Sequence, residues 1–206
     1  MNYYFDDRVG RYRSKKTGRF VSENRVINAT QDYIDIVVDD DVNYITDRFI
    51  DGKLTLQQWQ QRMKESLYES WKNSMTAGRG GKEQLTQSDY GRFGGYMASQ
   101  YRHLANFAWE IEQGKLTEAQ IRARARLYGR SARTALWNGV QAAKEAAGMN
   151  EERRVLAPEC KHCPDCQYYA SLGWVVIGLL PPPGAQCQCG PNCKCKKEYR
   201  RNSERI

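Results

Sequence analysis

The segment FIDGKLTLQQ at residues 49–58 returns in related form, as IEQGKLTEAQ, at residues 111–120. Each copy has the pattern of a helix that ends on a glycine, because glycine readily adopts the left-handed conformation that closes a helix. Thr55 and Thr117 follow, and each has a glutamine three residues later, which is the capping-box pattern of a helix start. Each copy therefore predicts a tight corner between two neighbouring antiparallel helices.

Apolar residues at helical spacing flank both corners and predict four helices. The predicted helices cover residues 28–49, 55–75, 86–111 and 117–147. The clearest apolar stripe lies on the second of them and consists of Trp59, Met63, Leu67 and Trp71. We therefore expect a mainly α protein whose body is an antiparallel four-helix bundle made of two hairpins.

The third predicted helix begins after a cap at Thr86 and contains the glycines Gly91, Gly94 and Gly95. Each glycine inside a helix costs up to about 1 kcal/mol relative to alanine. We expect close backbone contact with a neighbouring helix to offset that cost.

All seven cysteines lie in the last quarter of the chain, in one group of three and one group of four. Two close-set thiol groups on either side of a loop are the arrangement from which a four-thiolate zinc site is built. Between the groups, residues 174–177 suit a short strand, and the following prolines turn the chain back. We expect a small zinc-ribbon-like C-terminal module, stabilised by Zn²⁺ in a structural role because its hydrophobic burial is too small.

The candidate metal ligands are Cys163, Cys166, Cys187, Cys189, Cys193 and Cys195. Cys163 and Cys166 form one arm of the site, and the other arm is either of the two later pairs. Seven thiols also allow a second metal ion that shares a ligand with the first. His162 adjoins the cysteines and is an alternative ligand.

The net charge of +8 is concentrated at the two ends of the chain. Residues 1–25 and residues 194–206 each contribute +4, and the residues between them sum to zero. Such ends are typical of arms that contact a polyanion or an acidic protein surface, and equally of solvated tails. The candidate contact residues, which include a basic face of the fourth helix, are Arg11, Arg13, Lys15, Lys16, Arg19, Arg122, Arg126, Arg130, Lys196, Lys197, Arg200 and Arg201.

Together these patterns divide the chain into four segments. They are a basic N-terminal arm (1–25), a helical bundle (26–150), a Cys-rich zinc-binding module (151–199) and a basic tail (200–206). No apolar run reaches the length of a membrane span, and the first residues lack the pattern of a secretory signal. We expect no membrane association and a cytoplasm in which thiols stay reduced.

Catalytic groups are sparse, since the chain has only two histidines and no phosphate-binding loop. The C-x-x-C at Cys163 and Cys166 has the spacing of a dithiol oxidoreductase, but no alternating strand and helix pattern precedes it. We expect the protein not to be an enzyme.

The tail resembles the C-terminal end of phage head-morphogenesis (minor head, Mu F-like) proteins. The resemblance rests on Cys163-Pro164-Asp165-Cys166, Gly173-Trp174, Leu180-Pro181 and Cys187-Gln188-Cys189. The segment from Tyr12-Arg13 to Ser22 is also similar to the start of many phage structural proteins.

The resemblance implies a non-enzymatic virion component that acts near the portal in capsid assembly or DNA packaging. Its implied partners are portal or capsid proteins, with DNA as a further partner and a homo-oligomer compatible with the role. Its implied location is the virion, and the host cytoplasm during assembly. The alternative that the charges support is a zinc-stabilised nucleic-acid-binding protein.

Overall fold

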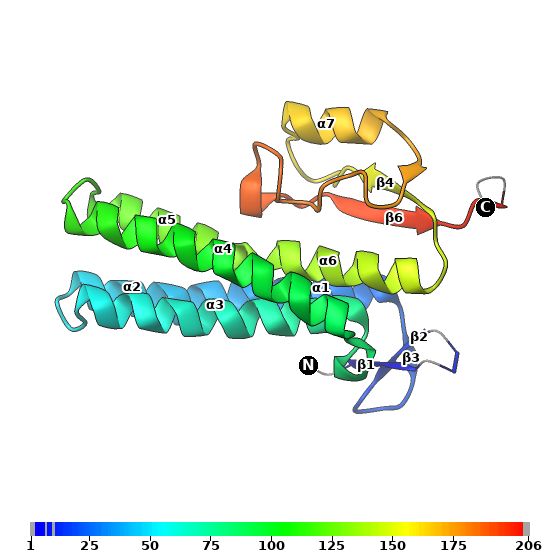
Figure 1. The fold of residues 1–206 in the computed structure, drawn as a ribbon, viewed down its shortest axis with the longest axis horizontal. Coiled ribbons are helices and arrows are strands. Elements are labelled where there is room, and N and C mark those ends of the chain that lie inside the picture. The colour runs from blue at the N-terminus through cyan, green and yellow to red at the C-terminus, as the bar shows by residue number, and fades with distance from the viewer. Residues whose placement is uncertain (1–2, 7, 10, 204–206) are drawn as a thin grey trace.

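Helices dominate the computed structural model, which describes residues 3–6, 8–9 and 11–203. The helices of the body are α1 (Glu23–Val37), the π-helical turn η1 (Val38–Val42), α2 (Asn43–Ile50), α3 (Leu56–Arg79), the short η2 (Lys82–Gln84), α4 (Gln87–Glu112), α5 (Glu118–Arg130) and α6 (Ala132–Ala146). Figure 1 shows α1, α2 and α3 running beside α4, α5 and α6 along one long axis. Within the described part of the chain, no helix has both the length and the apolar character needed to cross a bilayer.

Both predicted corners are present. Gly52 and Gly114 have φ values of 72° and 63°, and each lies shortly after the end of a helix. Thr55 and Thr117 cap α3 and α5 through complete capping boxes with the glutamines three residues later. The two corners lie at the same end of the molecule (Figure 1). Thr86 caps α4 in the same manner, with Asp89 as its reciprocal partner.

The first helical rod starts earlier than residue 28 and contains a π-helical turn. Ser22 caps it by accepting a hydrogen bond from the Arg25 backbone N–H at 3.3 Å. The π-helical turn η1 inserts one extra residue per turn, and both of its ends, Val38 and Val42, are fully buried. The extra residue thus keeps successive apolar side chains on the inner face of the rod.

The fourth predicted helix is divided at Ser131 into α5 and α6. The Ser131 hydroxyl donates to the Tyr128 carbonyl at 2.5 Å and accepts from the Trp71 indole N–H at 2.9 Å. A serine that bonds back to the preceding turn competes with the helical backbone and bends the helix. The prediction of one continuous helix over 117–147 is therefore wrong at this residue.

Two glycines bring α3 and α6 into backbone contact. A Cβ atom on Gly78 would lie 2.1 Å from the Leu136 carbonyl oxygen, and one on Gly139 would lie 2.3 Å from the Met75 carbonyl oxygen. Only glycine permits this approach at either position.

The glycines of α4 do not fill such a role. A Cβ atom on Gly91, Gly94 or Gly95 would meet no heavy atom within 4 Å. The expectation of close backbone contact at these residues is wrong, because this part of α4 exposes that face.

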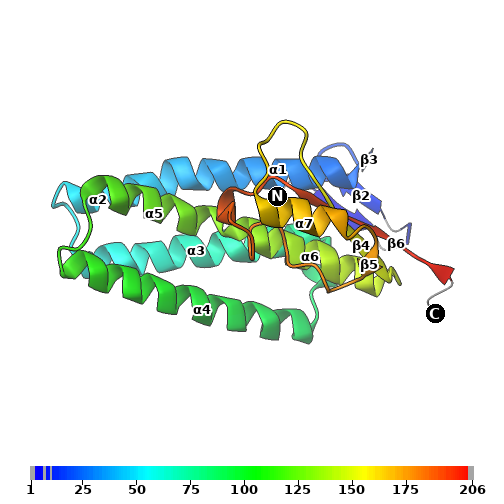
Figure 2. The ribbon, with the colours of Figure 1, turned by 90° about the horizontal axis from the view of Figure 1, so that it is seen from above.

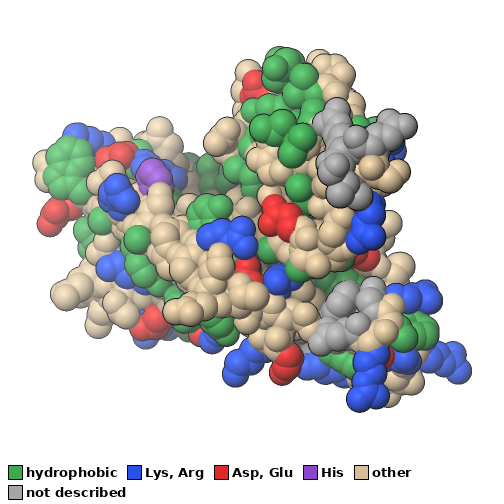
Figure 3. Space-filling view, turned by 45° about the vertical axis from the view of Figure 1, so that its right-hand side comes forward, with side chains coloured by type: hydrophobic (Ala, Val, Ile, Leu, Met, Phe, Trp, Pro, Cys, Tyr) green, Lys and Arg blue, Asp and Glu red, His purple; other side chains and the backbone are tan. Residues whose placement is uncertain are grey.

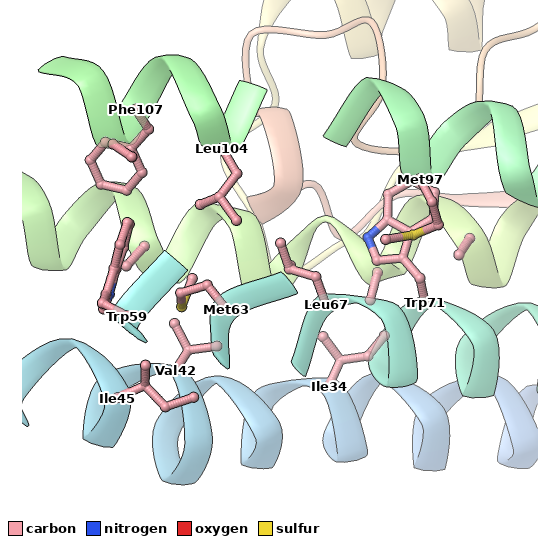
Figure 4. Close-up of a cluster of buried hydrophobic side chains, with 14 of the residues drawn as sticks. Ile34, Val42, Ile45, Trp59, Met63, Leu67, Trp71, Met97, Leu104 and Phe107 are labelled. Atoms are coloured by element: carbon pink, nitrogen blue, oxygen red, sulfur yellow. The ribbon is translucent and has the colours of Figure 1, made fainter. Parts of the chain in front are cut away.

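The predicted stripe of α3 forms the centre of the core. Figure 4 shows Trp59, Met63, Leu67 and Trp71 lying between side chains of α4 and those of α1 and α2. All four are nearly or fully buried. The Trp59 ring meets Phe107 of α4 edge to face, at 5.3 Å between centroids. Burial of aromatic side chains of this size dominates the stability of a helical body.

The residues expected to form a basic arm instead fold back on the helices. Strands β1 (Tyr3–Asp6), β2 (Arg11–Ser14) and β3 (Phe20–Val21) form an antiparallel sheet in that order. The Tyr12 side chain is buried, and its hydroxyl donates to the Ala77 carbonyl of α3 at 3.2 Å. Of the predicted arm, residues 1, 2, 7 and 10 lie outside the described residues.

The C-terminal part of the chain forms a second small sheet with one helix. Strand β4 (Glu151–Val155) lies between β5 (Val175–Val176) and β6 (Lys196–Arg200), and both pairings are antiparallel. Helix α7 (Pro164–Ser171) and the 3₁₀ turn η3 (Gly190–Asn192) lie between these strands in sequence. Figures 1 and 2 show this module over α6, on the face away from α3.

The first residues of the predicted basic tail contact the rest of the chain. Arg200 ends strand β6, and Arg201 donates to the Ala147 and Gly148 carbonyls at the end of α6. Residues 204–206 of that tail lie outside the described residues.

Candidate metal centre

The structure brings six of the seven cysteines into one cluster. The Sγ atoms of Cys163, Cys166, Cys187 and Cys189 all lie within 4.8 Å of one another. A second group, formed by Cys166, Cys193 and Cys195, meets the same criterion and is buried. All seven cysteines are free thiols. The cluster is therefore close enough to hold a metal ion, and Cys166 belongs to both groups.

Helix α7 positions the first pair of thiols. Cys163 is the N-cap residue of this helix, and Pro164 follows at its first position, where a missing N–H costs nothing. Cys166 lies in the first turn and is fully buried. The C-x-x-C across the start of this helix thus brings both sulfur atoms to one side, next to Cys187 and Cys189.

The second pair is tied to α7 by hydrogen bonds outside the thiols. The Gln188 backbone N–H donates to the Asp165 carboxylate at 2.8 Å, and the Tyr169 hydroxyl donates to the Gln186 carbonyl at 2.9 Å. Gln186 and Gln188 lie on either side of Cys187, and Gln188 directly precedes Cys189. The two hydrogen bonds hold the C-x-C segment against the helix that carries the C-x-x-C.

The turn η3 then brings the last pair back to the cluster. Gly190 opens this turn with a φ of 52°, and the Cys193 backbone N–H donates to its carbonyl at 3.0 Å. The Sγ atoms of Cys193 and Cys166 are 3.6 Å apart. The Sγ atom of Cys195 is 3.8 Å from Nδ1 of His162. Cys160 belongs to neither thiol group.

Hydrogen bonding within the cluster divides the thiols by acidity. Burial opposes ionisation of Cys163, yet hydrogen bonds from Cys166 and Cys189 lower its pKa to about 7. Burial, together with the hydrogen bond to Cys163, raises the pKa of the Cys166 thiol. In Cys193 the hydrogen bond with Cys195, followed by burial, likewise raises the pKa. Because the pKa values of Cys166 and Cys193 are raised, these two thiols keep their protons at neutral pH, and binding of a cation would release them.

A buried ion pair anchors the module to the helical body. The Lys197 and Glu152 side chains are both fully inaccessible to solvent, with Nζ 2.6 Å from Oε2. Lys197 also donates to the Gln141 amide oxygen of α6 at 2.9 Å. The other carboxylate oxygen of Glu152 accepts from the backbone N–H groups of Gly178 and Leu180. These contacts link strands β4 and β6 to α6 and to the proline loop, which is the segment 178–184 that contains Pro181, Pro182 and Pro183.

The sequence placed Lys197 among residues that contact a partner, and it did not single out Glu152. Both lie in charged strands, EERRV and KKEYR, whose composition is unusual for buried β-structure. The only sequence signal for their pairing is the opposite charge of Glu152 and Lys197 themselves, since the segment EERRV has no net charge.

Most predicted partner-binding residues on α5 and in the tail contact this chain itself. Arg122 pairs with Asp47 at 2.8 Å, and Arg200 pairs with Glu151 at 2.6 Å. Arg130 donates to the Asn192 side chain at 3.0 Å, which joins α5 to the thiol module. Lys196 lies 3.4 Å from the Asn28 side-chain oxygen, and Arg126 is half-buried on α5.

The basic residues near the N-terminus remain more accessible. Lys15, Lys16 and Arg19 are exposed at the turn between β2 and β3. Arg11 and Arg13 both lie over the Phe20 ring, at 4.5 and 3.9 Å from its centroid. Figure 3 shows Lys and Arg side chains gathered at the lower right of the view, where the N-terminal sheet lies.

Comparisons of the chain with protein-family models, with curated proteins and with solved structures find no match.

Proposed function

We propose that this chain is a non-enzymatic structural or assembly protein of a phage head. In this proposal the helical body is an antiparallel four-helix bundle, and the C-terminal module is a zinc-ribbon-like unit. The protein acts as a minor virion component near the portal, during capsid assembly or DNA packaging. It resides in the virion, and in the host cytoplasm before assembly.

The observation that carries the proposal is the identity of the four-thiol group. Cys163, Cys166, Cys187 and Cys189 are the cysteines on which the resemblance to minor head proteins rests, and their Sγ atoms lie together. The residues that link them, from the Gly173 turn to the proline loop, lie within the same module. The family-like motif and the spatial cluster are thus one feature.

Zinc is the metal that we propose for the module. Thiolates are soft ligands that favour Zn²⁺, and a site made only of cysteines leaves no position for substrate. Such a site stabilises a fold and performs no chemistry. This supports a structural role for the metal and a non-enzymatic role for the protein.

The charged surfaces favour a protein partner over DNA for the helical body. Arg122 and Arg130 of α5 are engaged with acceptors of the same chain, so they offer less free charge to phosphate groups. We propose portal or capsid proteins as the partners of that body.

The test is mass spectrometry of virions and procapsids purified from a lysate of the phage or induced prophage that encodes this chain. We expect the chain in both preparations, or in procapsids alone if it leaves during maturation. Absence from both, while the chain is detected in the lysate, would contradict the proposal. Zinc analysis of the reduced, purified protein tests the metal separately.

Nucleic-acid binding is the second candidate function, and the exposed cations at the β2–β3 turn favour it. A gel-shift assay at low salt should detect DNA binding that weakens steeply as salt is added, because phosphate contacts release counterions. The double variant Lys15→Glu/Lys16→Glu should abolish the shift. The matched control, Lys53→Glu/Arg62→Glu, changes net charge equally at exposed positions of the helical body. An equal loss in both variants would show only a general effect of charge.

A further inference from the structure

Cys166 occupies a special place in the thiol cluster, because it is the member common to both groups. The first group has four thiols and is complete as a tetrahedral site. The second group adds Cys193 and Cys195, which the first does not use. A second zinc ion would need four ligands with short separations between their donor atoms.

The sulfur separations in the second group fit tetrahedral coordination. Zn–S bonds of about 2.3 Å place neighbouring sulfur atoms of a tetrahedron about 3.8 Å apart. The Sγ atoms of Cys166 and Cys193 are 3.6 Å apart. All three residues of this group are buried, so the thiols face one another away from solvent. The group supplies three of the four ligands that a closed site requires.

His162 is the candidate for the fourth ligand, although its ring nitrogens do not lie within 4.8 Å of all three sulfur atoms. A tetrahedral site with one imidazole places its nitrogen about 3.6 Å from each sulfur, given Zn–N bonds of about 2.0–2.1 Å. Nδ1 of His162 lies 3.8 Å from Sγ of Cys195. This histidine precedes Cys163 directly in the sequence, so the same stretch of chain reaches both groups. Cys₃His is an ordinary ligand set for structural zinc.

We infer that the module binds two metal ions, with the Cys166 thiolate bridging both. The second ion is held by Cys166, Cys193 and Cys195, and His162 becomes its fourth ligand when its ring moves from Cys195 toward the other two sulfur atoms. The inference rests on the metal module of the proposed function. A shared thiolate also suits the charge of the cluster. Two divalent ions and six thiolates leave less negative charge per ion than two separate four-thiolate sites would. A second ion further explains why the chain brings six thiols together where one ion needs four.

The test is titration of the reduced, metal-free protein with Co²⁺ alone, followed by its thiolate-to-metal absorption and its electron paramagnetic resonance. We expect saturation at two ions per chain. A bridging thiolate couples the two spins, so the resonance signal should fall as the second ion binds. A signal that grows in proportion up to two ions would place the second ion away from Cys166 and overturn the bridge.

Three variants assign the ligands. Cys193→Ser should reduce the stoichiometry from two ions to one and remove the spin coupling. Cys160→Ser is the matched control, since Cys160 belongs to neither group, and it should still bind two coupled ions. His162→Ala should weaken the second ion about tenfold or more while the first is unchanged, because even groups that only orient a ligand contribute that much. Unchanged affinity in His162→Ala would remove this histidine from the site.

The stoichiometry of the unmodified protein separates this inference from the proposed function. One ion per chain would overturn the second site and leave the four-thiol zinc site intact. No bound ion would overturn both the second site and the metal module. Presence or absence of the chain in phage particles is independent of either result.

Discussion

Glycines in the helices of this protein occupy two opposite environments, one closely packed and one open to solvent. Gly139 lies where α6 touches the backbone of α3, whereas Gly94 lies in the first third of α4 with open space beside it. Glycine costs a helix the same conformational entropy in both places. Only at the crossing does a close contact depend on the missing side chain.

We predict opposite signs for the same substitution at these two residues. Gly139→Ala should lower the free energy of unfolding by about 2 kcal/mol or more, because the added methyl overlaps the Met75 carbonyl. Gly94→Ala should raise it by about 0.5–1 kcal/mol, because alanine favours the helix and meets no neighbour. Urea unfolding followed by circular dichroism measures both. A destabilised Gly94→Ala variant would show that α4 is covered in the folded protein.

Asp89 of α4 connects several elements through its buried side chain. Its fully buried carboxylate accepts from the Arg79 guanidinium of α3 at 3.0 Å and from Arg92 of α4 at 2.9 Å. The Thr86 backbone N–H and hydroxyl also donate to it. Arg79 in turn donates to the Ala142 carbonyl of α6. Burial alone would raise the pKa of Asp89, but the hydrogen bonds from Thr86 and Arg79 outweigh it and hold the pKa below its usual value.

The lowered pKa of Asp89 predicts a loss of stability in acid. The unfolded chain binds this proton near pH 3.9, and the folded chain only at lower pH. The stabilisation is therefore complete above about pH 4 and declines as the pH falls through the folded pKa. Asp89→Asn should lower the free energy of unfolding at neutral pH by about 3 kcal/mol. It should also show a weaker dependence on pH below 4.

Urea midpoints measured from neutral to acidic pH check this prediction. The exposed Asp32→Asn variant is the control and should change stability by no more than about 0.5 kcal/mol. Parallel pH profiles for Asp89→Asn and the unmodified protein would contradict the assignment.

At the scale of elements, the junction of α5 and α6 depends on a contact between distant parts of the chain. Ser131 accepts the indole N–H of Trp71, a residue of α3 that is almost fully buried. Removal of the hydroxyl leaves that donor without its acceptor in the core. A buried donor that loses its partner costs about 1–3 kcal/mol.

We therefore predict that Ser131→Ala lowers the free energy of unfolding by about 1–2 kcal/mol and alters the tryptophan emission. Ser70→Ala is the matched control in α3. Its hydroxyl is buried without a hydrogen-bond partner among the described residues, so its removal should be neutral or slightly stabilising. Equal effects of the two substitutions would show that the Trp71 contact contributes little.

The elements that could be predicted from the sequence are those fixed by local chemistry. The corners at Gly52 and Gly114 and the cap at Thr86 follow from residues three or four positions apart, and all are present. The break at Ser131 could not be predicted, because its hydroxyl bonds both to the local Tyr128 carbonyl and to a tryptophan sixty residues away in the sequence. The π-helical turn at Val38–Val42 also follows from packing, since Gly129 of α5 lies against both valines.

At the scale of the whole molecule, the sequence located the thiol site but not how it joins the body. Clustered cysteines are visible in any sequence, and their spacing predicted the site. That Cys166 belongs to two groups depends on the fold of η3 and could not be read from spacing. Strands β4 and β6 were not predicted either. A charged sequence such as EERRV is typical of a solvent-exposed segment, and its burial depends on the ion pair between Glu152 and Lys197, which are far apart in the sequence.

Removal of the metal should unfold the module selectively. With the proposed zinc chelated, backbone amides of residues 156–195 should lose protection from hydrogen exchange, because little apolar surface holds that segment. Helices α1–α6 should keep theirs, since their core lies around Trp59 and Trp71. Hydrogen exchange with mass spectrometry measures both regions in one sample. Unchanged protection of the module after chelation, or equal loss in both regions, would contradict a structural role for the metal.

The ladder that pairs Val155 with Lys196 closes the segment with all seven cysteines into a backbone ring. A ring closed at its base samples fewer conformations than an open chain of equal length, so its sulfur atoms stay near one another before any ion arrives. The pairing of β4 with β6 thus preorganises the thiols, which raises the affinity for a metal ion although the sheet supplies no ligand. Strand β6 should therefore govern how tightly the proposed ion is held, although none of its residues belongs to the two thiol groups.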